Sequence, residues 1–326
     1  MRAYRVQTPG GAEVLTMTTI ADPKPKPGWV VIGVKAFGIN RSELYTRRGE
    51  SGDAVRFPRV LGIECVGEVI DAGGTDLAIG DKVAAAMGGM GRTYDGGYAE
   101  MTVVPRRQVM RFESDLPWET LGALPETYYT AWTSLFDDLR LEGGQTILIR
   151  GGSSSVGMAA ASIADHLGCT VIATTRKPDK AERMRNAGVH HVVIDEGQGI
   201  RAAVEAVRPA GVDGVLELVG LPATIAECAT LIRRGGHLCH TGLLGDRWDT
   251  ALPSMPDGVG YSFGNSETVE TGRWTAVTQT IVDRVAAGAY RANVHEVFPF
   301  ARLQEAHRCM EDNRATGKLV VRTMPG

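Results

Sequence analysis

The first 115 or so residues carry short apolar segments that glycine and proline interrupt. Pro25-Lys26-Pro27-Gly28 ends one segment, and a run rich in β-branched residues follows it directly. Such runs favour strands, whereas glycine and proline mark turns. The pattern predicts strands over residues 29–36, 66–70, 81–85 and 98–104. Because helical periodicity is scarce here, an irregular β-rich domain is expected.

The pattern changes near Leu116. Residues 118–140 are predicted to be helical with a break at Pro125, and from Gln145 short apolar strands alternate with helices. The predicted strands are residues 146–150, 170–174, 192–195, 212–219 and 237–241, and the predicted helices are residues 156–167, 180–186, 200–207 and 223–231. This alternation is typical of parallel strands joined by right-handed crossovers, so a doubly wound parallel sheet is expected. Another helix is predicted at 272–287, and the tail from Val297 is predicted to be strand, helix and strand.

Composition and charge narrow the class of protein. The chain has 326 residues, enough for two domains, and 35 basic residues face 38 acidic ones, so no basic excess favours nucleic acid as the main partner. No apolar run approaches the roughly 18 residues of a membrane span, and the N-terminus has no apolar signal core. A cytoplasmic protein without a membrane partner is therefore expected. The five cysteines are scattered, with no Cys-x-x-Cys pair, so neither a disulfide framework nor a cysteine-rich zinc site is indicated.

A glycine- and serine-rich turn joins the strand at 146–150 to a helix of small residues. Such a turn lets the backbone approach a pyrophosphate, and the helix N-terminus supplies N–H groups and a positive dipole end. Against the pattern Gly-x-Gly-x-x-Gly, Gly152 is first and Gly157 is third, and Ser154 stands where the second glycine belongs. A Cβ there limits the approach of a phosphate, although a serine hydroxyl can donate a hydrogen bond. The strand and helix on either side favour a dinucleotide site over a merely capped helix.

The end of the second strand of this sheet indicates which dinucleotide binds. An NAD site has a carboxylate here for the ribose hydroxyls, whereas an NADP site has cations for the 2′-phosphate. The sequence is Thr174-Thr175-Arg176-Lys177-Pro178-Asp179-Lys180, with no acid at the strand end. Three nearby cations and a missing acid predict NADPH as the cofactor, with a solvated helix start as the plainer interpretation.

Ordered motifs run along nearly the whole chain. Together with the turn at Gly151 to Gly157, they are Gly38-Ile39-Asn40, Leu61-Gly62-Ile63-Glu64-Cys65-Val66-Gly67, Gly80-Asp81-Lys82-Val83, Gly96-Gly97-Tyr98, Thr130-Ala131-Trp132, Leu218-Val219-Gly220, Gly235-Gly236 and Gly317-Lys318-Leu319-Val320. On these motifs the chain resembles the zinc-free medium-chain dehydrogenases/reductases of the quinone oxidoreductase (zeta-crystallin-like) type. The resemblance implies an α/β protein: a GroES-like β-rich catalytic domain of residues 1–118, completed by 289–326, plus a Rossmann domain with a doubly wound parallel sheet at 119–288.

Two positions argue against a catalytic metal. Zinc-dependent relatives have a cysteine shortly after the segment matching Gly38-Ile39-Asn40, and a histidine in a Gly-His-Glu segment. Here those stretches are Asn40-Arg41-Ser42-Glu43 and Gly62-Ile63-Glu64. Because isoleucine cannot bind a metal and no histidine accompanies Glu64, no metal site is expected. Without a Lewis acid to ionise an alcohol, reduction of an activated acceptor fits better than alcohol oxidation.

The resemblance implies specific site residues. Asn40, Glu43 and Tyr45 match an asparagine, an acid and a tyrosine of the family's active cleft, although the family acid is commonly aspartate. Alternatively, Asn40 ends a strand, Glu43 is a surface charge, and Tyr45 is a wall residue. The implied cofactor contacts are Thr130, Gly152, Ser154, Ser155, Val156, Gly157, Thr175, Arg176, Lys180, Val219, Gly220, Gly242, Leu243 and Lys318.

The expected activity is NADPH-dependent, zinc-independent transfer of a hydride to a quinone or another α,β-unsaturated carbonyl. Tyr45 or water would supply the proton. Two alternatives stay open: reduction of the double bond of alkenals, enones or acyl thioesters, and an NADPH-binding protein with little turnover. The segment Gly258 to Gly264 predicts a strand at a sheet edge. Because relatives pair such edges across a two-fold axis, a homodimer is expected.

Overall fold

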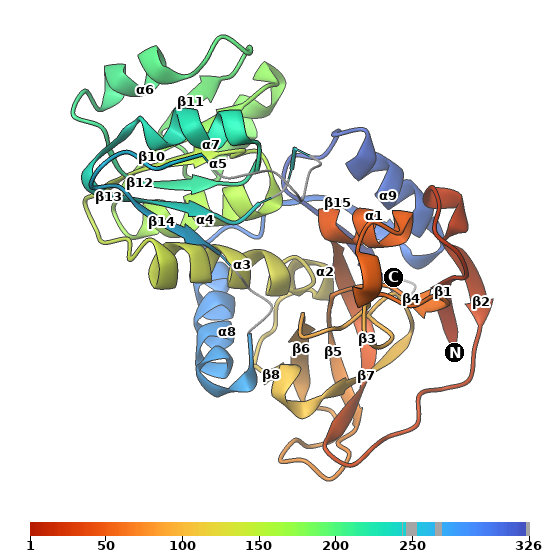
Figure 1. Cartoon of the computed structure of the whole chain (residues 1–326). Coiled ribbons are helices and arrows are strands. Elements are labelled where there is room, and N and C mark those ends of the chain that lie inside the picture. The colour runs from red at the N-terminus through yellow and green to blue at the C-terminus, as the bar shows by residue number, and fades with distance from the viewer. Residues whose placement is uncertain (243, 246–252, 265–268, 324–326) are drawn as a thin grey trace. The chain divides into compact units, whose positions relative to one another are not determined.

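The computed structural model describes residues 1–242, 244–245, 253–264 and 269–323. The chain forms two compact units. Unit 1 comprises Met1–Glu126, Ser266–Ala287 and Val294–Gly326, and unit 2 comprises Thr127–Asn265 and Gly288–Asn293 (Figure 1). No helix in the described part of the chain is long and apolar enough to cross a membrane.

Unit 1 is built on β-sheets. The seven-stranded sheet has the order β15-β16-β3-β5-β6-β8, with β7 also paired to β3, and a second sheet has the order β2-β1-β4. The strands are β1 (Arg2–Val6), β2 (Thr16–Thr19), β3 (Trp29–Ile39), β4 (Arg59–Val60), β5 (Glu64–Asp71), β6 (Lys82–Ala86), β7 (Met101–Pro105), β8 (Val109–Arg111), β15 (Val294–Pro299) and β16 (Lys318–Arg322). Its helices are α1 (Arg41–Arg48), α2 (Trp118–Leu121), α8 (Thr271–Ala286) and α9 (Leu303–Glu311), and α3 (Pro125–Trp132) begins at its boundary with unit 2.

The C-terminal tail completes the sheet of unit 1. Strand β16 pairs antiparallel with β3, with Leu319 opposite Ile39, and β15 adds to β16 in parallel. This pairing places Lys318 beside the end of β3, next to Asn40. The aromatic rings of Phe37, Tyr98 and Phe300 pack within the core that the sheet encloses.

Unit 2 has one parallel sheet of six strands. Its order is β11-β10-β9-β12-β13-β14, and every neighbouring pair is parallel. The strands are β9 (Thr146–Arg150), β10 (Thr170–Thr175), β11 (His191–Ile194), β12 (Val212–Glu217), β13 (Ile232–His240) and β14 (Gly260–Phe263), and the helices between them are α4 (Ser155–His166), α5 (Ala181–Asn186), α6 (Arg201–Val207) and α7 (Pro222–Ala229). The order steps outward from β9 in both directions, as in a doubly wound sheet. The predicted fold class, a GroES-like β-rich domain plus a Rossmann domain, is confirmed.

Three features differ from the sequence pattern. Helix α1 was not predicted, because its buried polar residues interrupt any apolar stripe. The predicted helical stretch is interrupted before Pro125 as expected, but the proline is itself the first residue of α3, since proline suits the first turn. Helix α8 lies in unit 1, whereas the expected boundary assigned residues 119–288 to the parallel-sheet domain. The expected edge strand is β14, at one end of the sheet of unit 2.

Candidate active site

The turn after β9 requires glycine for steric reasons. A Cβ at Gly152 would lie 2.6 Å from the Cβ of Ala173, and one at Gly157 would lie 2.7 Å from the carbonyl oxygen of Gly151. Gly151 itself has φ +86°, a conformation that L side chains rarely adopt. The glycines therefore let α4 start directly against β9 and β10, which is the close packing that a dinucleotide turn needs.

Ser154 is the N-cap of helix α4. Its Oγ accepts a hydrogen bond from the N–H of Gly157 at 3.1 Å and donates one to the carbonyl oxygen of Gly151 at 2.8 Å. The hydroxyl is thus committed within the turn, so the compensating bond to a phosphate expected of Ser154 is not available in this conformation. The N–H groups of Ser155 and Val156 lie in the first helical turn, where no intrahelical acceptor exists, and they can face an anion.

The end of β10 presents an exposed cation. Thr175 is buried and its Oγ1 accepts a hydrogen bond from the N–H of Lys177, whereas the side chain of Arg176 is exposed. Within the described residues, Arg176 has no hydrogen bond or ion pair. Lys180 is 8% exposed and has contacts of its own, so of these two predicted cations Arg176 is the more available.

Glu217, the last residue of β12, organises the next loop. Its carboxylate accepts hydrogen bonds from the N–H groups of Val219 (3.2 Å) and Gly220 (2.7 Å) and from the hydroxyl of Thr224 (3.0 Å). Burial raises the pKa of Glu217 to about 7, although these three hydrogen bonds lower it. A Cβ at Gly242 would lie 2.2 Å from the carbonyl oxygen of Leu218, so the two predicted loops pack closely.

Two further residues, Thr130 and Leu243, were predicted to contact the cofactor. Thr130 lies on α3 in unit 2 and is 5% exposed. Leu243 lies outside the described residues.

In unit 1, Asn40 belongs to a buried network of charges. Its side-chain amide donates to Oε1 of Glu64 at 2.9 Å and accepts from Nζ of Lys318 at 2.6 Å. Lys318 and Glu64 are both fully buried and form an ion pair of 2.7 Å, and Oε2 of Glu64 accepts the N–H of Glu126. Burial lowers the pKa of Lys318, but the charges of Glu64 and Glu126 outweigh burial and the net pKa is raised. Lys318 therefore stays charged, and it fixes the orientation of the Asn40 amide.

Glu43 lies at the third position of α1 and is 1% exposed. Its carboxylate accepts three hydrogen bonds: from the N–H of Asn40 (2.7 Å), from the N–H of Ile63 (2.7 Å) and from the hydroxyl of Tyr98 (2.5 Å). A glutamate at this position commonly caps its own helix by reaching back to the N-cap N–H. Burial raises the pKa of Glu43 to about 7, against the three hydrogen bonds.

The network continues away from Glu43. The hydroxyl of Tyr98 lies 2.9 Å from Nε2 of His307, whose Nδ1 lies 3.1 Å from a guanidinium nitrogen of Arg47. Arg47 also pairs with Glu311. Sequence analysis did not single out His307 or Arg47, and no local motif pointed to them. Glu64 and Tyr98 do lie in motifs that the sequence shows, and these motifs were the one indication in the sequence that the two residues belong to the site.

The predicted residue Tyr45 lies on α1 and is 2% exposed. The Arg48 guanidinium lies 5.2 Å from the centre of its ring. Of the predicted site residues, Asn40, Glu43 and Lys318 share one hydrogen-bonded network in unit 1. The glycine turn, Arg176 and the loops after β12 and β13 belong to unit 2.

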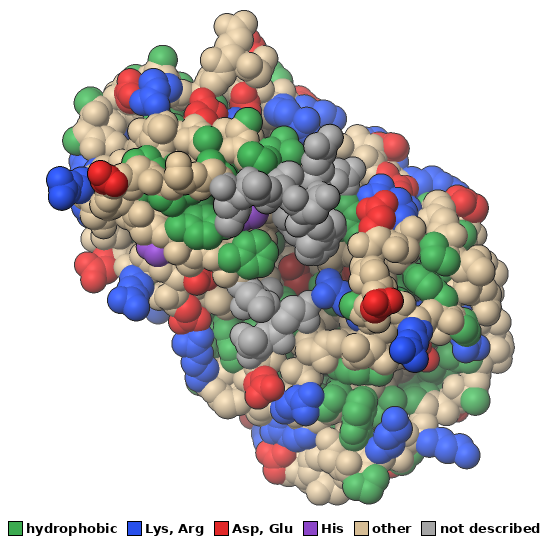
Figure 2. All heavy atoms as spheres, in the orientation of Figure 1, with side chains coloured by type: hydrophobic (Ala, Val, Ile, Leu, Met, Phe, Trp, Pro, Cys, Tyr) green, Lys and Arg blue, Asp and Glu red, His purple; other side chains and the backbone are tan. Residues whose placement is uncertain are grey.

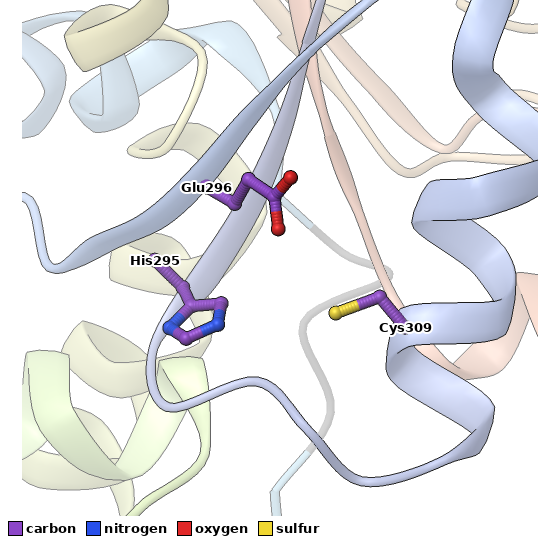
Figure 3. A group of neighbouring side chains, drawn as sticks. All are labelled: His295, Glu296 and Cys309. Carbon is purple, nitrogen blue, oxygen red and sulfur yellow. The ribbon is translucent and has the colours of Figure 1, made fainter.

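The two stretches in which zinc-dependent relatives are expected to carry ligands are Asn40-Arg41-Ser42-Glu43 and Gly62-Ile63-Glu64 here, and neither contains cysteine or histidine. A separate group of possible ligands occurs elsewhere in unit 1. His295 and Glu296 on β15 and Cys309 on α9 bring their ligand atoms within 4.8 Å of one another (Figure 3). An irregularity in the pairing of β15 with β16 falls between Val294 and Glu296, and such bulges allow consecutive side chains to share a face. These three residues are not part of the Asn40 network.

Comparison with known proteins identifies the family. Residues 26–114 match the model described as alcohol dehydrogenase GroES-like domain, and residues 187–321 match that described as zinc-binding dehydrogenase. The quinone oxidoreductase of Homo sapiens is 27% identical over 98% of this chain and 97% of its own length. The polyketide synthase GfsB of Streptomyces halstedii is 28% identical over 98% of this chain, which spans only 6% of that protein. The structure of Escherichia coli quinone oxidoreductase complexed with NADPH has a TM-score of 0.87 at 19% identity, covering 99% of this chain and all of that one.

The chain thus belongs to the medium-chain dehydrogenase/reductase family, in its zinc-free, quinone oxidoreductase-like group. The relatives and similar structures that are named as enzymes of this group are oxidoreductases, such as the quinone oxidoreductases and a 2-haloacrylate reductase.

Proposed function

We propose that this protein is an NADPH-dependent reductase that transfers a hydride to a quinone or to the β-carbon of an α,β-unsaturated carbonyl. The observation that carries the choice of cofactor is the end of β10. There Thr175 replaces the acid that would bind ribose hydroxyls, and Arg176 is exposed with no ion pair within the described residues. A planar guanidinium suits a 2′-phosphate, whereas NADH offers it only hydroxyls.

The residues of unit 2 fit a dinucleotide. The glycine turn has no room for Cβ atoms at Gly152 and Gly157, and the first N–H groups of α4 are free of intrahelical acceptors. When bound, NADPH would supply the hydride. We assign the pyrophosphate to the turn of Gly152, Ser154, Ser155, Val156 and Gly157, in which Ser154 acts as the helix cap and the N–H groups of Ser155 and Val156 face the phosphates. We assign the 2′-phosphate to Thr175, Arg176 and Lys180. Thr130, Val219, Gly220, Gly242, Leu243 and Lys318 are proposed as further cofactor contacts.

The residues of unit 1 act on the acceptor in this proposal. The orientation of the Asn40 amide is set by Lys318 and Glu64, which makes it a preorganised hydrogen-bond group. Tyr45 or water would deliver the proton to the oxygen that gains charge. Residues 1–118 with 289–326 are proposed as the catalytic domain and 119–288 as the NADPH-binding domain, except that helix α8 of the second range packs with unit 1. A cytoplasmic location also stays a prediction.

A second acceptor class is the double bond of an acyl thioester. The observation in favour of that class is the similarity of this chain to a segment of a polyketide synthase. A protein that binds NADPH with little turnover is the remaining alternative. The interspersed acidic and basic side chains on the face shown in Figure 2 fit a small-molecule enzyme better than a nucleic-acid-binding protein.

The deciding experiment measures NADPH oxidation with three acceptors: a quinone, a simple enone and an enoyl thioester. We expect turnover with at least one of them, and we expect it to survive exhaustive chelation. Cys309→Ser serves as a control, because it removes one of the three possible metal ligands, His295, Glu296 and Cys309. Its rate of NADPH oxidation should equal that of the wild type. Tight NADPH binding without oxidation by any acceptor would favour the binding-protein alternative, and loss of activity on chelation would contradict metal independence.

A further inference from the structure

The hydrogen bonds from Arg47 to Glu43 run in a single direction. Arginine has only donors, so His307 Nδ1 must accept from Arg47. Burial, followed by the charge of Arg47, lowers the pKa of His307 to about 3, so the ring is neutral and its one proton is on Nε2. That N–H then donates to the oxygen of Tyr98, and the hydrogen of Tyr98 is directed to Glu43.

Glu43 is the acceptor at the end of this chain. Its other two partners are the backbone N–H groups of Asn40 and Ile63, which belong to different segments of unit 1. The carboxylate therefore ties the start of α1 to the loop between β4 and β5. Because all three partners of Glu43 are hydrogen-bond donors, an ionised carboxylate can accept a hydrogen bond from each of them. In a protonated carboxyl group, the added hydrogen would face the hydrogen of one of these donors.

We propose that Tyr98, His307 and Arg47 are positioning residues: acting through Glu43, they hold Asn40 and the Ile63 segment in the geometry that catalysis requires. We refer to Glu43, Tyr98, His307 and Arg47 as the Glu43 relay. This inference rests on the proposed function, in which Asn40 acts on the acceptor. The relay differs from a surface ion pair because Glu43, Tyr98, Arg47 and His307 are at most 1% exposed.

The charged surroundings of Glu43 define how it titrates. Glu64 on β5 disfavours a second negative charge at Glu43, whereas the positive charge of Lys318 on β16 favours it. Arg47 on α1 faces Glu43 only through His307 and Tyr98. The hydroxyl of Tyr98 is held neutral because burial raises its pKa well above 10. Removing the Tyr98 hydroxyl deletes one of three bonds that stabilise the ionised form. Glu43 should then protonate at a higher pH.

The test compares Tyr98→Phe with the wild type. A hydrogen bond to a charged group changes a pKa by about one to two units, so the acidic limb of the pH profile of kcat/KM, expected near pH 7, should move up by that amount. Tyr128→Phe is the matched control. It also deletes a hydrogen bond of a buried hydroxyl, 2.7 Å long to the carbonyl oxygen of Arg291, but this bond is in unit 2, whereas Glu43 belongs to unit 1. It should leave the limb in place, and Glu43→Gln should abolish that limb.

A second pair of variants covers the case in which Tyr98→Phe does not fold. His307→Gln retains a donor for Tyr98, whereas His307→Leu does not. We expect His307→Leu to move the limb upward and His307→Gln to restore it. A folded Tyr98→Phe protein whose limb stays at the wild-type pH would overturn the proposal, as would equal profiles for the two His307 variants.

The readout can be made independent of turnover. Difference infrared titration detects the protonated carboxyl band, and subtracting the Glu43→Gln spectrum isolates Glu43 from Glu217, which also titrates near pH 7. The isolated band should appear at a higher pH in Tyr98→Phe. If no acceptor is reduced, the proposed function fails while this titration still decides the relay. An unshifted band in the folded variant would reject it.

Discussion

At the residue scale, buried charges in unit 1 are matched by buried partners. Lys318 and Glu64 have no exposed surface, and both make further hydrogen bonds, to Asn40 and to the backbone of Glu126. An unpaired buried charge costs several kcal/mol, so the members of such a network depend on one another. Arg176 is the opposite case, an exposed charge with no partner within the described residues. Lys318 and Glu64 therefore support the fold, whereas Arg176 is the residue that we propose binds the 2′-phosphate.

Replacing Arg176 by alanine should weaken discrimination between the two cofactors. Charge-assisted hydrogen bonds are worth on the order of 1.5–3 kcal/mol, and at an exposed site the lower end applies. We expect the KM for NADPH to rise about tenfold. The KM for NADH and the maximal rate should change little. Steady-state kinetics with both cofactors makes the measurement.

Arg185→Ala is the control for this prediction, because Arg185 is also an exposed arginine, on α5. It should leave both KM values near those of the wild type. Equal use of NADPH and NADH by the wild type, or a variant that keeps its preference, would refute the assignment of the β10 end.

At the element scale, strand ends in unit 2 are organised by side chains that cap the following loop. Ser154 caps α4 within the turn after β9, and Glu217 gathers the N–H groups of the loop after β12. These caps hold the loops at the carboxyl edge of the parallel sheet, where ligands bind in open α/β sheets. The cap at Glu217 is made by a buried carboxyl group, so it should respond to pH.

Stability should reflect the raised pKa of Glu217. A carboxyl whose pKa is about 7 in the folded state and near 4.5 when unfolded stabilises the fold most below pH 4.5, and that contribution is lost as the pH rises through 7. The full change corresponds to roughly 3 kcal/mol. Between pH 4.5 and 8, the wild type should therefore lose about this much unfolding free energy relative to Glu217→Gln, which has no carboxyl group to titrate at this position. Urea unfolding across this range measures it, and a constant difference would contradict the prediction.

At the scale of the whole molecule, β14 is the exposed edge of the six-stranded sheet. Among the residues that the structure describes, β14 pairs only with β13, and Phe263 at its end is 54% exposed. An edge strand with an exposed aromatic side chain is a liability unless another chain covers it. Pairing of two β14 edges across a two-fold axis would satisfy both the backbone and the ring, which supports the expected homodimer.

Sedimentation at micromolar concentration should show a dimer. Phe263→Lys introduces a charge on the edge and should yield monomers, because like charges would oppose each other across the axis. Ile79→Lys is the control: Ile79 is 77% exposed and belongs to unit 1, whereas β14 belongs to unit 2, so this variant should stay dimeric. A monomeric wild type would exclude the homodimer at this concentration.

The sequence by itself determined those parts of the protein that depend on local constraints. The alternation of strands and helices from Gln145 onward and the glycine turn at Gly152 and Gly157 were both visible, because periodicity and steric freedom act over a few residues. Helix α1 was not predicted, because its polar residues Glu43 and Arg47 give no apolar stripe in the sequence. They are buried only through contacts with residues far along the chain.

Only the tertiary structure decided what surrounds Asn40 and Glu43. Lys318 contacts Asn40, 278 residues earlier in the chain, because β16 pairs with β3. His307 contacts Tyr98, 209 residues earlier, because α9 packs against β15 and β16 of the same sheet. Burial then makes these contacts consequential, since it raises the pKa of Glu43 and lowers that of His307. A local pattern carries no record of such pairings, because strand register and desolvation are properties of the assembled fold.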